Sequence, residues 1–378
     1  MIYLDNSATT YPKPLAVYQA INNAVRIYGF NPGRGGYRQS IRASEKVFET
    51  RSTIKRFFNV STEENVIFTS GCTEALNMVI KGVLKRGDHV VISSMEHNAV
   101  LRPVQKLSNN GMITYTIAEV KADNDETLAN FRKSINNRTK LFICTHASNV
   151  FGIRLPVERL CALAHSYNIM FCLDAAQSAG VLPVDVQGDN YDFVCCAGHK
   201  YLYGPMGTGL LLINNDTLLD TLTEGGTGSQ SAETEMPSFY PDRLEAGTGN
   251  IAGIIGLGEG VDFVSKRGID NIYKKETRLI KTLSERLSTL DKVTVYPNYN
   301  GAPVLSLDMK GRNSEDIARY LSERSDIAVR SGLHCAPLAH QSMGTIDKGT
   351  VRISPSVFTT ENDIKILFNS LRKLHNSP

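Results

Sequence analysis

A lysine in a glycine-rich turn is the most reactive group that the sequence offers. Lys200 follows the apolar run Phe193-Val-Cys-Cys and the segment Ala197-Gly198-His199, and it precedes Tyr-Leu-Tyr-Gly-Pro-Met-Gly. Loss of hydration in such a turn lowers the pKa of a lysine amine and makes it nucleophilic. The position suits a Schiff base with an aldehyde cofactor, although Gly-Pro also marks an ordinary turn.

An aspartate ends another apolar run. Asp174 follows Ile169-Met-Phe-Cys-Leu and precedes Ala-Ala-Gln177, with no lysine or arginine beside it in the sequence. A carboxylate at the end of a buried strand needs a cation as partner, or its pKa rises until it is neutral. A protonated ring nitrogen would supply that cation. Capping of a helix N-terminus is the alternative interpretation.

Two further polar segments follow apolar runs. Ser70-Gly71-Cys72-Thr73-Glu74 is a small-residue turn that opens a helical pattern. Free N–H groups and the helix dipole favour a phosphate at such a turn. Glu96-His97-Asn98 opens the next helical pattern, and the imidazole of His97 is placed to stack on a flat ring. Simple helix caps are the alternative at both positions.

Together these side chains match the three supports that pyridoxal 5′-phosphate (PLP) requires. They are a lysine for the Schiff base, an aspartate for the ring nitrogen and a turn that holds the phosphate. The chain carries them in the order Thr73, His97, Asp174, Lys200. We therefore predict PLP as the cofactor.

Short apolar strands that alternate with amphipathic helices carry these residues. Strands are predicted at residues 66–69, 89–93, 140–145, 169–174, 193–196 and 209–213, and helices at residues 73–84, 98–107 and 156–166. This alternation indicates an α/β fold with a mostly parallel sheet covered on both faces. Ligands on such sheets lie beyond the carboxyl ends of the strands, where the polar segments should meet.

The pattern changes after residue 268. Charged helices at residues 272–287, 314–323 and 361–374 flank strands at residues 292–295 and 304–307. We predict a large PLP-binding domain at residues 15–255. Residues 1–14 together with residues 256–378 should form a smaller α+β domain that carries Cys335.

Composition excludes several other classes of protein. Lys and Arg total 41 against 38 Asp and Glu, a net charge of +3, and no dense basic run is present, which argues against nucleic-acid binding. No run approaches the roughly 18 apolar residues that a membrane helix needs. Seven scattered cysteines form neither a disulfide framework nor a Cys-x-x-Cys zinc pair, so reduced thiols, no metal site and a cytoplasmic location are expected.

The joint occurrence of three motifs resembles a known family. Asp174-Ala-Ala-Gln177, Ala197-Gly-His199-Lys200 and Arg330-Ser-Gly-Leu-His-Cys335-Ala are similar to those of cysteine desulfurases with the class V aminotransferase fold. The resemblance is strongest to the group II type, which also includes selenocysteine lyases. It extends from Tyr3-Leu-Asp-Asn-Ser to Val351-Arg352-Ile-Ser. It implies a PLP-dependent, aspartate-aminotransferase-like architecture of fold type I.

The resemblance also implies roles for individual residues. Lys200 would form the Schiff base and take the α-proton of L-cysteine, Cys335 would attack the sulfur and keep it as a persulfide, and His97 would stack on the cofactor ring. The other implied cofactor contacts are Asp174 with the ring nitrogen, Gln177 with the ring hydroxyl, and Cys72, Thr73 and His199 around the phosphate. Asn149 and Arg352 would bind the substrate carboxylate with help from Arg330. Thr248 would reach the phosphate of a second subunit, which implies a homodimer.

Three positions depart from the family pattern. Ala197 stands where a phosphate-binding serine is usual, Cys72 stands where a threonine is common, and Leu333 replaces the first of two histidines before the cysteine. Arg34, in a glycine-rich segment, is a further candidate for contact with the cleft.

Other functions remain open at this level. Selenocysteine lyase, or another PLP lyase or aminotransferase of the same fold, is the alternative activity, and a non-catalytic scaffold is the alternative outside enzymes. The sequence also leaves open which acceptor takes the persulfide sulfur. Iron–sulfur cluster assembly, tRNA thiolation and selenium delivery are the processes it could serve.

Overall fold

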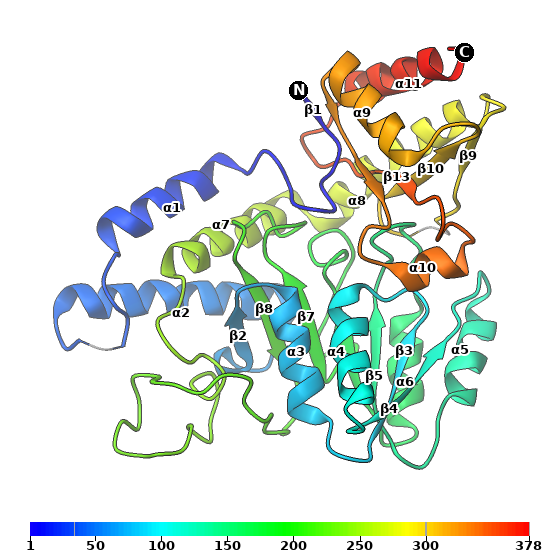
Figure 1. Ribbon diagram of the computed structural model, residues 1–378. Coiled ribbons are helices and arrows are strands. Elements are labelled where there is room, and N and C mark those ends of the chain that lie inside the picture. The colour runs from blue at the N-terminus through cyan, green and yellow to red at the C-terminus, as the bar shows by residue number, and fades with distance from the viewer. Residues whose placement is uncertain (34, 299–300, 378) are drawn as a thin grey trace.

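A seven-stranded sheet forms the centre of the molecule in the computed structural model, which describes residues 1–33, 35–298 and 301–377. Arg34 lies outside the described residues. The strand order is β2-β8-β7-β6-β5-β3-β4, and β8 runs in the opposite direction to the other six strands (Figure 1). The strands are β2 (Val66–Thr69), β3 (His89–Ser93), β4 (Thr114–Ala118), β5 (Thr139–Thr145), β6 (Met170–Asp174), β7 (Phe193–Ala197) and β8 (Gly209–Ile213).

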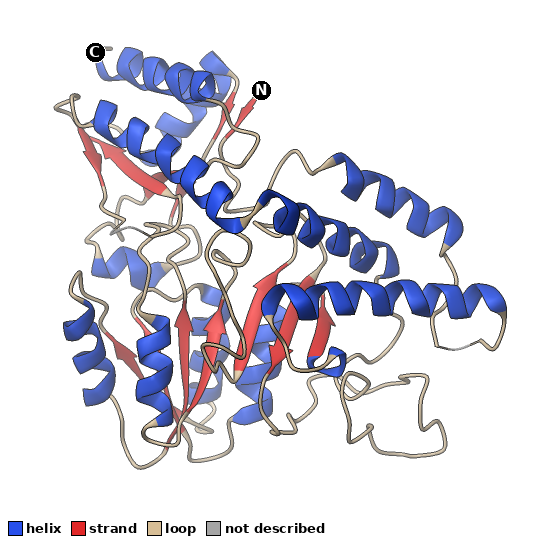
Figure 2. Ribbon diagram, turned by 180° about the vertical axis from the view of Figure 1, so that it is seen from behind, coloured by secondary structure: helices blue, strands red, loops and turns tan. Residues whose placement is uncertain are grey.

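Helices cover both faces of this sheet (Figure 2). One face packs against α3 (Cys72–Val83) and α4 (Asn98–Asn109). The other packs against α2 (Arg38–Phe58), α5 (Asn124–Lys133), α6 (Val157–His165) and α7 (Ile251–Arg267). Apart from Lys140, the residues of β5, β7 and β8 are buried, because the sheet is covered from both sides. Ile67 and Leu211 face one core, and their neighbours Phe68 and Leu210 face the other.

The glycine-rich helix α7 supports the turn that carries Lys200. Gly260 lies so close to this turn that a Cβ there would be 2.3 Å from the carbonyl oxygen of Leu202. A larger residue would push the helix away from the turn. The small residues of α7 thus let a helix backbone support the turn of the predicted Schiff-base lysine directly.

A smaller α+β unit lies above one end of the sheet in Figure 1. Its antiparallel sheet has the order β12-β13-β10-β9, and β1 pairs in parallel with β11. Its core also includes Leu4, so the first residues of the chain pack with the last. The strands are β1 (Ile2–Tyr3), β9 (Val293–Val295), β10 (Leu305–Met309), β11 (Ile327–Ala328), β12 (Arg330–Gly332) and β13 (Thr350–Ile353). The helices are α8 (Ile269–Leu287), α9 (Ser314–Ser325), α10 (Pro337–Ser342) and α11 (Glu361–His375).

Most predicted elements are present within two or three residues of their predicted bounds, and the α/β class with a mostly parallel central sheet is confirmed. The predicted elements do not include four helices and five strands of the structure: α1 (Leu15–Ile27), α2, α5 and α10, and β1, β4, β11, β12 and β13. The predicted domain boundary at residues 255 and 256 falls inside α7, and the division into two domains stays a prediction. Among the described residues, no helix is long and apolar enough to cross a membrane.

Candidate active site

A cavity of about 260 Å³ opens at the carboxyl ends of the parallel strands. It brings together eight of the predicted site residues from five separate segments: Cys72, Thr73, His97, Asn149, Asp174, Gln177, His199 and Lys200. Ala197, the first departure from the family pattern, also lines it. The sheet explains this arrangement, because each segment follows a strand that ends at the same edge.

Asp174 is the last residue of β6 and is buried. Its Oδ1 accepts a hydrogen bond from the Ala176 N–H at 2.9 Å and one from the Cys72 thiol at 3.4 Å. Burial raises the pKa of Asp174, whereas the Ala176 N–H and the nearby Lys200 act in the opposite direction. The carboxylate therefore lacks full compensation for its lost hydration, and a cation in the cavity would supply it.

Lys200 lies on the cavity wall beside two arginines. Burial lowers its pKa, and the positive charges of Arg352 and Arg330 add to that effect, while Asp174 opposes it. The direction matches the prediction made from the glycine-rich turn. A lysine with a lowered pKa is available as a neutral amine, the form that reacts with an aldehyde.

His97 is the N-cap of α4, and its Nδ1 accepts a hydrogen bond from the Ala99 N–H at 3.0 Å. Burial, followed by the charges of Lys200 and Arg330, lowers the pKa of His97 to about 4. The imidazole is therefore neutral at pH 7, with its proton on Nε2. A neutral flat ring on the cavity wall is able to stack on another ring.

Three buried polar atoms at the cavity have no hydrogen-bond partner among the described residues: Asn149 Oδ1, Gln177 Oε1 and His199 Nδ1. The last two belong to residues for which the resemblance implies contacts with the cofactor. The amide nitrogen of Gln177 is used, because it donates to the Ser7 carbonyl at 3.0 Å. Unpaired buried polar atoms are costly, so these two indicate a polar ligand that the protein chain does not provide. A hydroxyl and a phosphate, as PLP carries, fit this pair.

An N-terminal segment for which the sequence analysis predicted no role in the site holds the turn of Lys200 in place. The carbonyl oxygen of His199 accepts hydrogen bonds from Thr9 Oγ1 at 3.0 Å, Thr10 N at 3.1 Å and Lys13 Nζ at 2.7 Å. Thr10 Oγ1 also donates to the Lys200 carbonyl at 2.9 Å. The adjacent Thr-Thr pair near the start of the chain was the available signal, but nothing local shows which distant carbonyl it serves.

Arg352, predicted to bind the substrate carboxylate, is buried and already holds other partners. Its Nη2 donates to Asp5 Oδ1 at 2.5 Å and its Nη1 to the Asn149 carbonyl at 2.9 Å, while Nε has no described partner. Asn149 in turn donates from Nδ2 to the His334 carbonyl at 2.8 Å. Asp5 is therefore a residue of this site that the sequence analysis missed.

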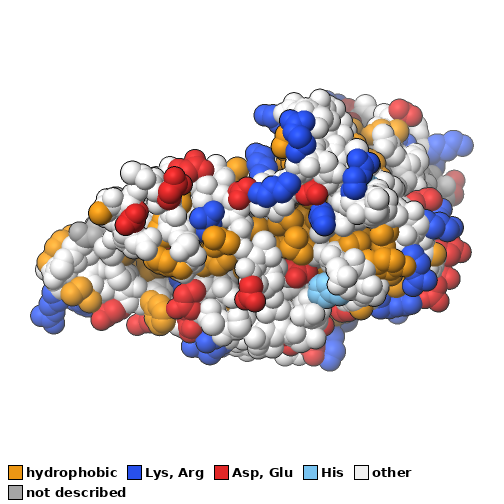
Figure 3. Space-filling model, turned by 90° about the horizontal axis from the view of Figure 1, so that it is seen from below, with side chains coloured by type: hydrophobic (Ala, Val, Ile, Leu, Met, Phe, Trp, Pro, Cys, Tyr) orange, Lys and Arg blue, Asp and Glu red, His pale blue; other side chains and the backbone are white. Residues whose placement is uncertain are grey.

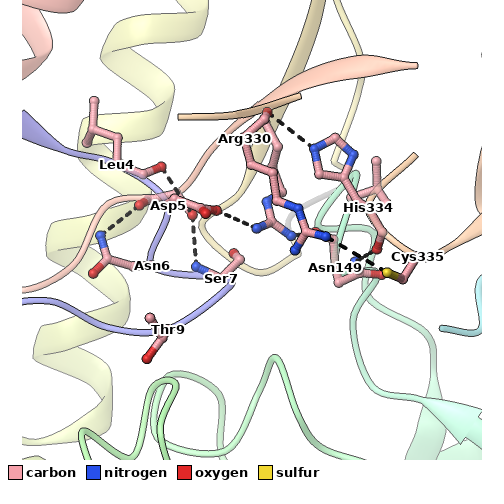
Figure 4. Close-up of polar contacts among 12 residues, drawn as sticks. Leu4, Asp5, Asn6, Ser7, Thr9, Asn149, Arg330, His334 and Cys335 are labelled. Atoms are coloured by element: carbon pink, nitrogen blue, oxygen red, sulfur yellow. Dashed lines mark hydrogen bonds and ion pairs between the residues drawn. The ribbon is translucent and has the colours of Figure 1, made fainter. Parts of the chain in front are cut away.

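Cys335 lies in a strained loop next to this network (Figure 4). Its φ of 57° and the φ of 51° at His334 place two consecutive non-glycine residues in the left-handed region. The Cys335 carbonyl accepts a hydrogen bond from the Asn98 N–H at 2.8 Å, which joins the loop to the start of α4. Cys335 is exposed, and Arg330 Nη2 lies 3.8 Å from its sulfur. The loop thus presents a thiol beside a guanidinium.

His334, the residue before Cys335, does not supply a positive charge beside the thiol. Burial lowers its pKa to about 2, its Nε2 donates to the Arg330 carbonyl at 3.3 Å, and its ring stacks on His340 with centroids 5.8 Å apart. Of His334 and Arg330, it is therefore Arg330 that places a positive charge next to the Cys335 sulfur.

Thr248 lies outside the Lys200 cavity. It lines a separate cavity of about 510 Å³ together with residues of α2 and the turn before β8. Five cysteines with no predicted role, Cys144, Cys161, Cys172, Cys195 and Cys196, are buried. Among the described residues, no group of three or more metal-ligating side chains is gathered.

The central sheet, the smaller α+β unit and a cavity at the carboxyl ends define an aspartate-aminotransferase-like protein of fold type I. The aminotransferase class-V family model matches residues 2–367, and the chain belongs to this family. It is 34% identical over 382 residues to the "Probable cysteine desulfurase" of Methanothermobacter thermautotrophicus, covering 99% of this chain and 94% of that one. It is 31% identical over 386 residues to a "Cysteine desulfurase" of Escherichia coli, covering 99% and 93%.

Solved structures give the same assignment. The apo cysteine desulfurase of Thermococcus onnurineus superposes with a TM-score of 0.91 at 32% identity, covering 99% of this chain and 94% of that one. The cysteine desulfurase CsdA of Escherichia coli superposes with a TM-score of 0.88 at 27% identity, covering 98% and 94%.

Proposed function

We propose that the protein is a PLP-dependent cysteine desulfurase. The overall reaction converts L-cysteine and the Cys335 thiol into L-alanine and a Cys335 persulfide. One observation carries the proposal: Lys200, Asp174 and His97 line one cavity, and the Cys335 loop is hydrogen-bonded to the residue that follows His97. A nucleophilic amine and an exposed thiol are thereby held at one site.

The residues around the cavity fit PLP. Thr73 and His199 would hold the phosphate with the N-terminus of α3, Gln177 would accept a hydrogen bond from the ring hydroxyl, and Asp174 would pair with the ring nitrogen. Cys72 would act through Asp174, which its thiol contacts. When bound, PLP supplies an electron sink for the electrons released at the substrate α-carbon.

Lys200 would perform the proton transfer. Burial lowers the pKa of Lys200, which favours the uncharged amine, the form that would take the α-proton of the substrate. The neutral ring of His97 would cover one side of the cofactor and exclude water there. Burial would therefore favour both the uncharged amine of Lys200 and the neutral ring of His97.

Cys335 would receive the sulfur. Its Sγ would attack the substrate sulfur as the bond between that sulfur and the β-carbon breaks. The bonding pair would stay with the β-carbon, which takes up a proton to complete L-alanine, and the sulfur would remain on Cys335 as a persulfide. Thiolates, rather than thiols, perform such attacks, and the guanidinium of Arg330 would bring a positive charge next to the reacting sulfur. Asn149, Arg352 and Arg330 would hold the substrate carboxylate.

We also propose a homodimer. The long helices α1 and α2 extend from one side of the molecule, and hydrophobic side chains show in patches on this arm in Figure 3. Exposed apolar residues on it include Leu15, Val25, Ile41 and Phe48. Thr248 would reach the phosphate held by the second subunit. Size measurement by sedimentation tests this part of the proposal.

A reconstitution experiment tests the activity. Protein mixed with PLP should turn yellow, consume L-cysteine and form alanine together with one persulfide per Cys335. Lys200→Ala should abolish the colour that hydroxylamine removes, and Cys335→Ala should keep it. A protein that shows no PLP-dependent consumption of L-cysteine would overturn the proposal, and turnover of L-selenocysteine alone would favour a selenocysteine lyase.

A further inference from the structure

Cys72 makes a contact that its place in the sequence does not suggest. It is the first residue of α3, after β2, whereas Asp174 ends β6, with β8 and β7 between those two strands. The Cys72 sulfur nevertheless lies 3.4 Å from Asp174 Oδ1. The helix therefore carries its first side chain across the edge of the sheet to the carboxylate.

The thiol acts as a hydrogen-bond donor in this contact. Burial and the negative charge of Asp174 both raise the pKa of Cys72 well above its ordinary value, so the sulfur keeps its proton. The Ala176 N–H donates to the same oxygen at 2.9 Å. Both hydrogen bonds described for the side chain of Asp174 thus end on Oδ1, and none ends on Oδ2.

We propose that Cys72 is a positioning residue that orients Asp174 and favours its negatively charged form toward the ring nitrogen of PLP. The inference rests on the proposed cofactor and assigns to Cys72 a role through the carboxylate rather than through the phosphate. The other titratable groups that interact electrostatically with Asp174 are Lys200, Glu96, Cys195 and Cys196. Of Cys72 and these four groups, Cys72 is the one that donates a described hydrogen bond to the carboxylate.

Matched substitutions test the donor. Cys72→Ala removes it, and Cys72→Ser keeps a donor of similar size. The measurement is the Kd for PLP, followed by absorbance across a pH series, with circular dichroism to confirm folding. Loss of one hydrogen bond should raise the Kd of Cys72→Ala by about threefold to tenfold, while Cys72→Ser stays near the parent value.

The direction of the pH effect on PLP affinity follows from the pKa of Asp174. A lost donor raises the pKa of Asp174, so the carboxylate becomes neutral at a higher pH as the solution is acidified. As the pH is lowered, the loss of PLP affinity should therefore begin at a higher pH in Cys72→Ala than in the parent protein. Equal Kd values and equal midpoints for Cys72→Ala and the parent, or a Cys72→Ser protein that behaves like Cys72→Ala, would overturn the inference. The pair Cys72→Thr and Cys72→Val repeats the comparison if the alanine protein does not fold.

Asp174→Asn separates this inference from the proposed function. If Asp174→Asn leaves PLP binding unchanged, the proposed cofactor site itself is wrong. If it weakens binding and Cys72→Ala does not, the role of Cys72 alone is wrong. In the Asp174→Asn background, Cys72→Ala should have no further effect on the Kd, and a full additive effect would contradict the proposed coupling.

Discussion

The ion pair between Arg51 and Glu245 joins the loop that carries Thr248 to the edge of the central sheet. Arg51 Nη1 and Nη2 each donate to a carboxylate oxygen of Glu245 at 2.9 Å. Glu245 Oε1 also accepts from the Phe68 N–H at 2.7 Å, and the guanidinium lies 4.5 Å from the Phe68 ring centroid. Glu245→Ala would therefore remove the carboxylate that the buried Arg51 guanidinium and the Phe68 N–H both contact.

The size of the effect follows from burial. The exposed fractions of the two side chains are 8% for Arg51 and 24% for Glu245. Removing one partner of a fully buried pair costs about 3–5 kcal/mol, and partial exposure of Glu245 points to about 3 kcal/mol. Glu245→Ala should also weaken PLP binding, because the loop with Thr248 loses its attachment to β2.

Urea unfolding followed by far-ultraviolet circular dichroism measures the effect, since the chain contains no tryptophan. Glu49→Ala on α2 is the matched control. Its partner Lys46 lies at 2.7 Å, but the two side chains are 32% and 63% exposed, so the loss should stay below about 1 kcal/mol. Equal free energies of unfolding for Glu245→Ala and Glu49→Ala would refute the reasoning.

Three further outcomes are expected. Cys335→Ser should reduce persulfide formation to background while the PLP absorbance remains, and sulfur transfer at the parental rate would contradict the role of the thiol. Asp5→Asn should lower the KM for L-cysteine, because Arg352 then meets the substrate carboxylate without a competing anion; an increase in KM would count against this. Burial lowers the pKa of His340 to about 4 from an unfolded value of 6.5, so the unfolded state binds more protons between these pH values. Stability should therefore fall as the pH drops through that window, and His340→Gln should reduce the slope of the unfolding free energy by up to about 1.4 kcal/mol per pH unit. An unchanged slope would show that His340 is not protonated on unfolding.

Local sequence was sufficient for much of the fold because its signals are short-range. Apolar strands such as residues 209–213 and the helix at residues 98–107 are recognisable from spacing, and the structure contains both. The helices α1 and α2 were harder to predict, since each exposes apolar side chains and buries a narrow stripe. The roles of the site residues remain predictions, although eight of them line one cavity.

The α/β class, the turn of Lys200 and the strand end of Asp174 were predictable from the sequence, because each depends on residues adjacent in the chain. The distant groups that these residues meet depend on the folded arrangement of separate elements. Cys72 contacts Asp174 across 102 residues, and Asp5 holds Arg352 across 347 residues. Burial, and with it the pKa of each group, depends on what packs against it from other elements. For that reason the neutral state of His334 was not evident from a motif that places it beside Cys335.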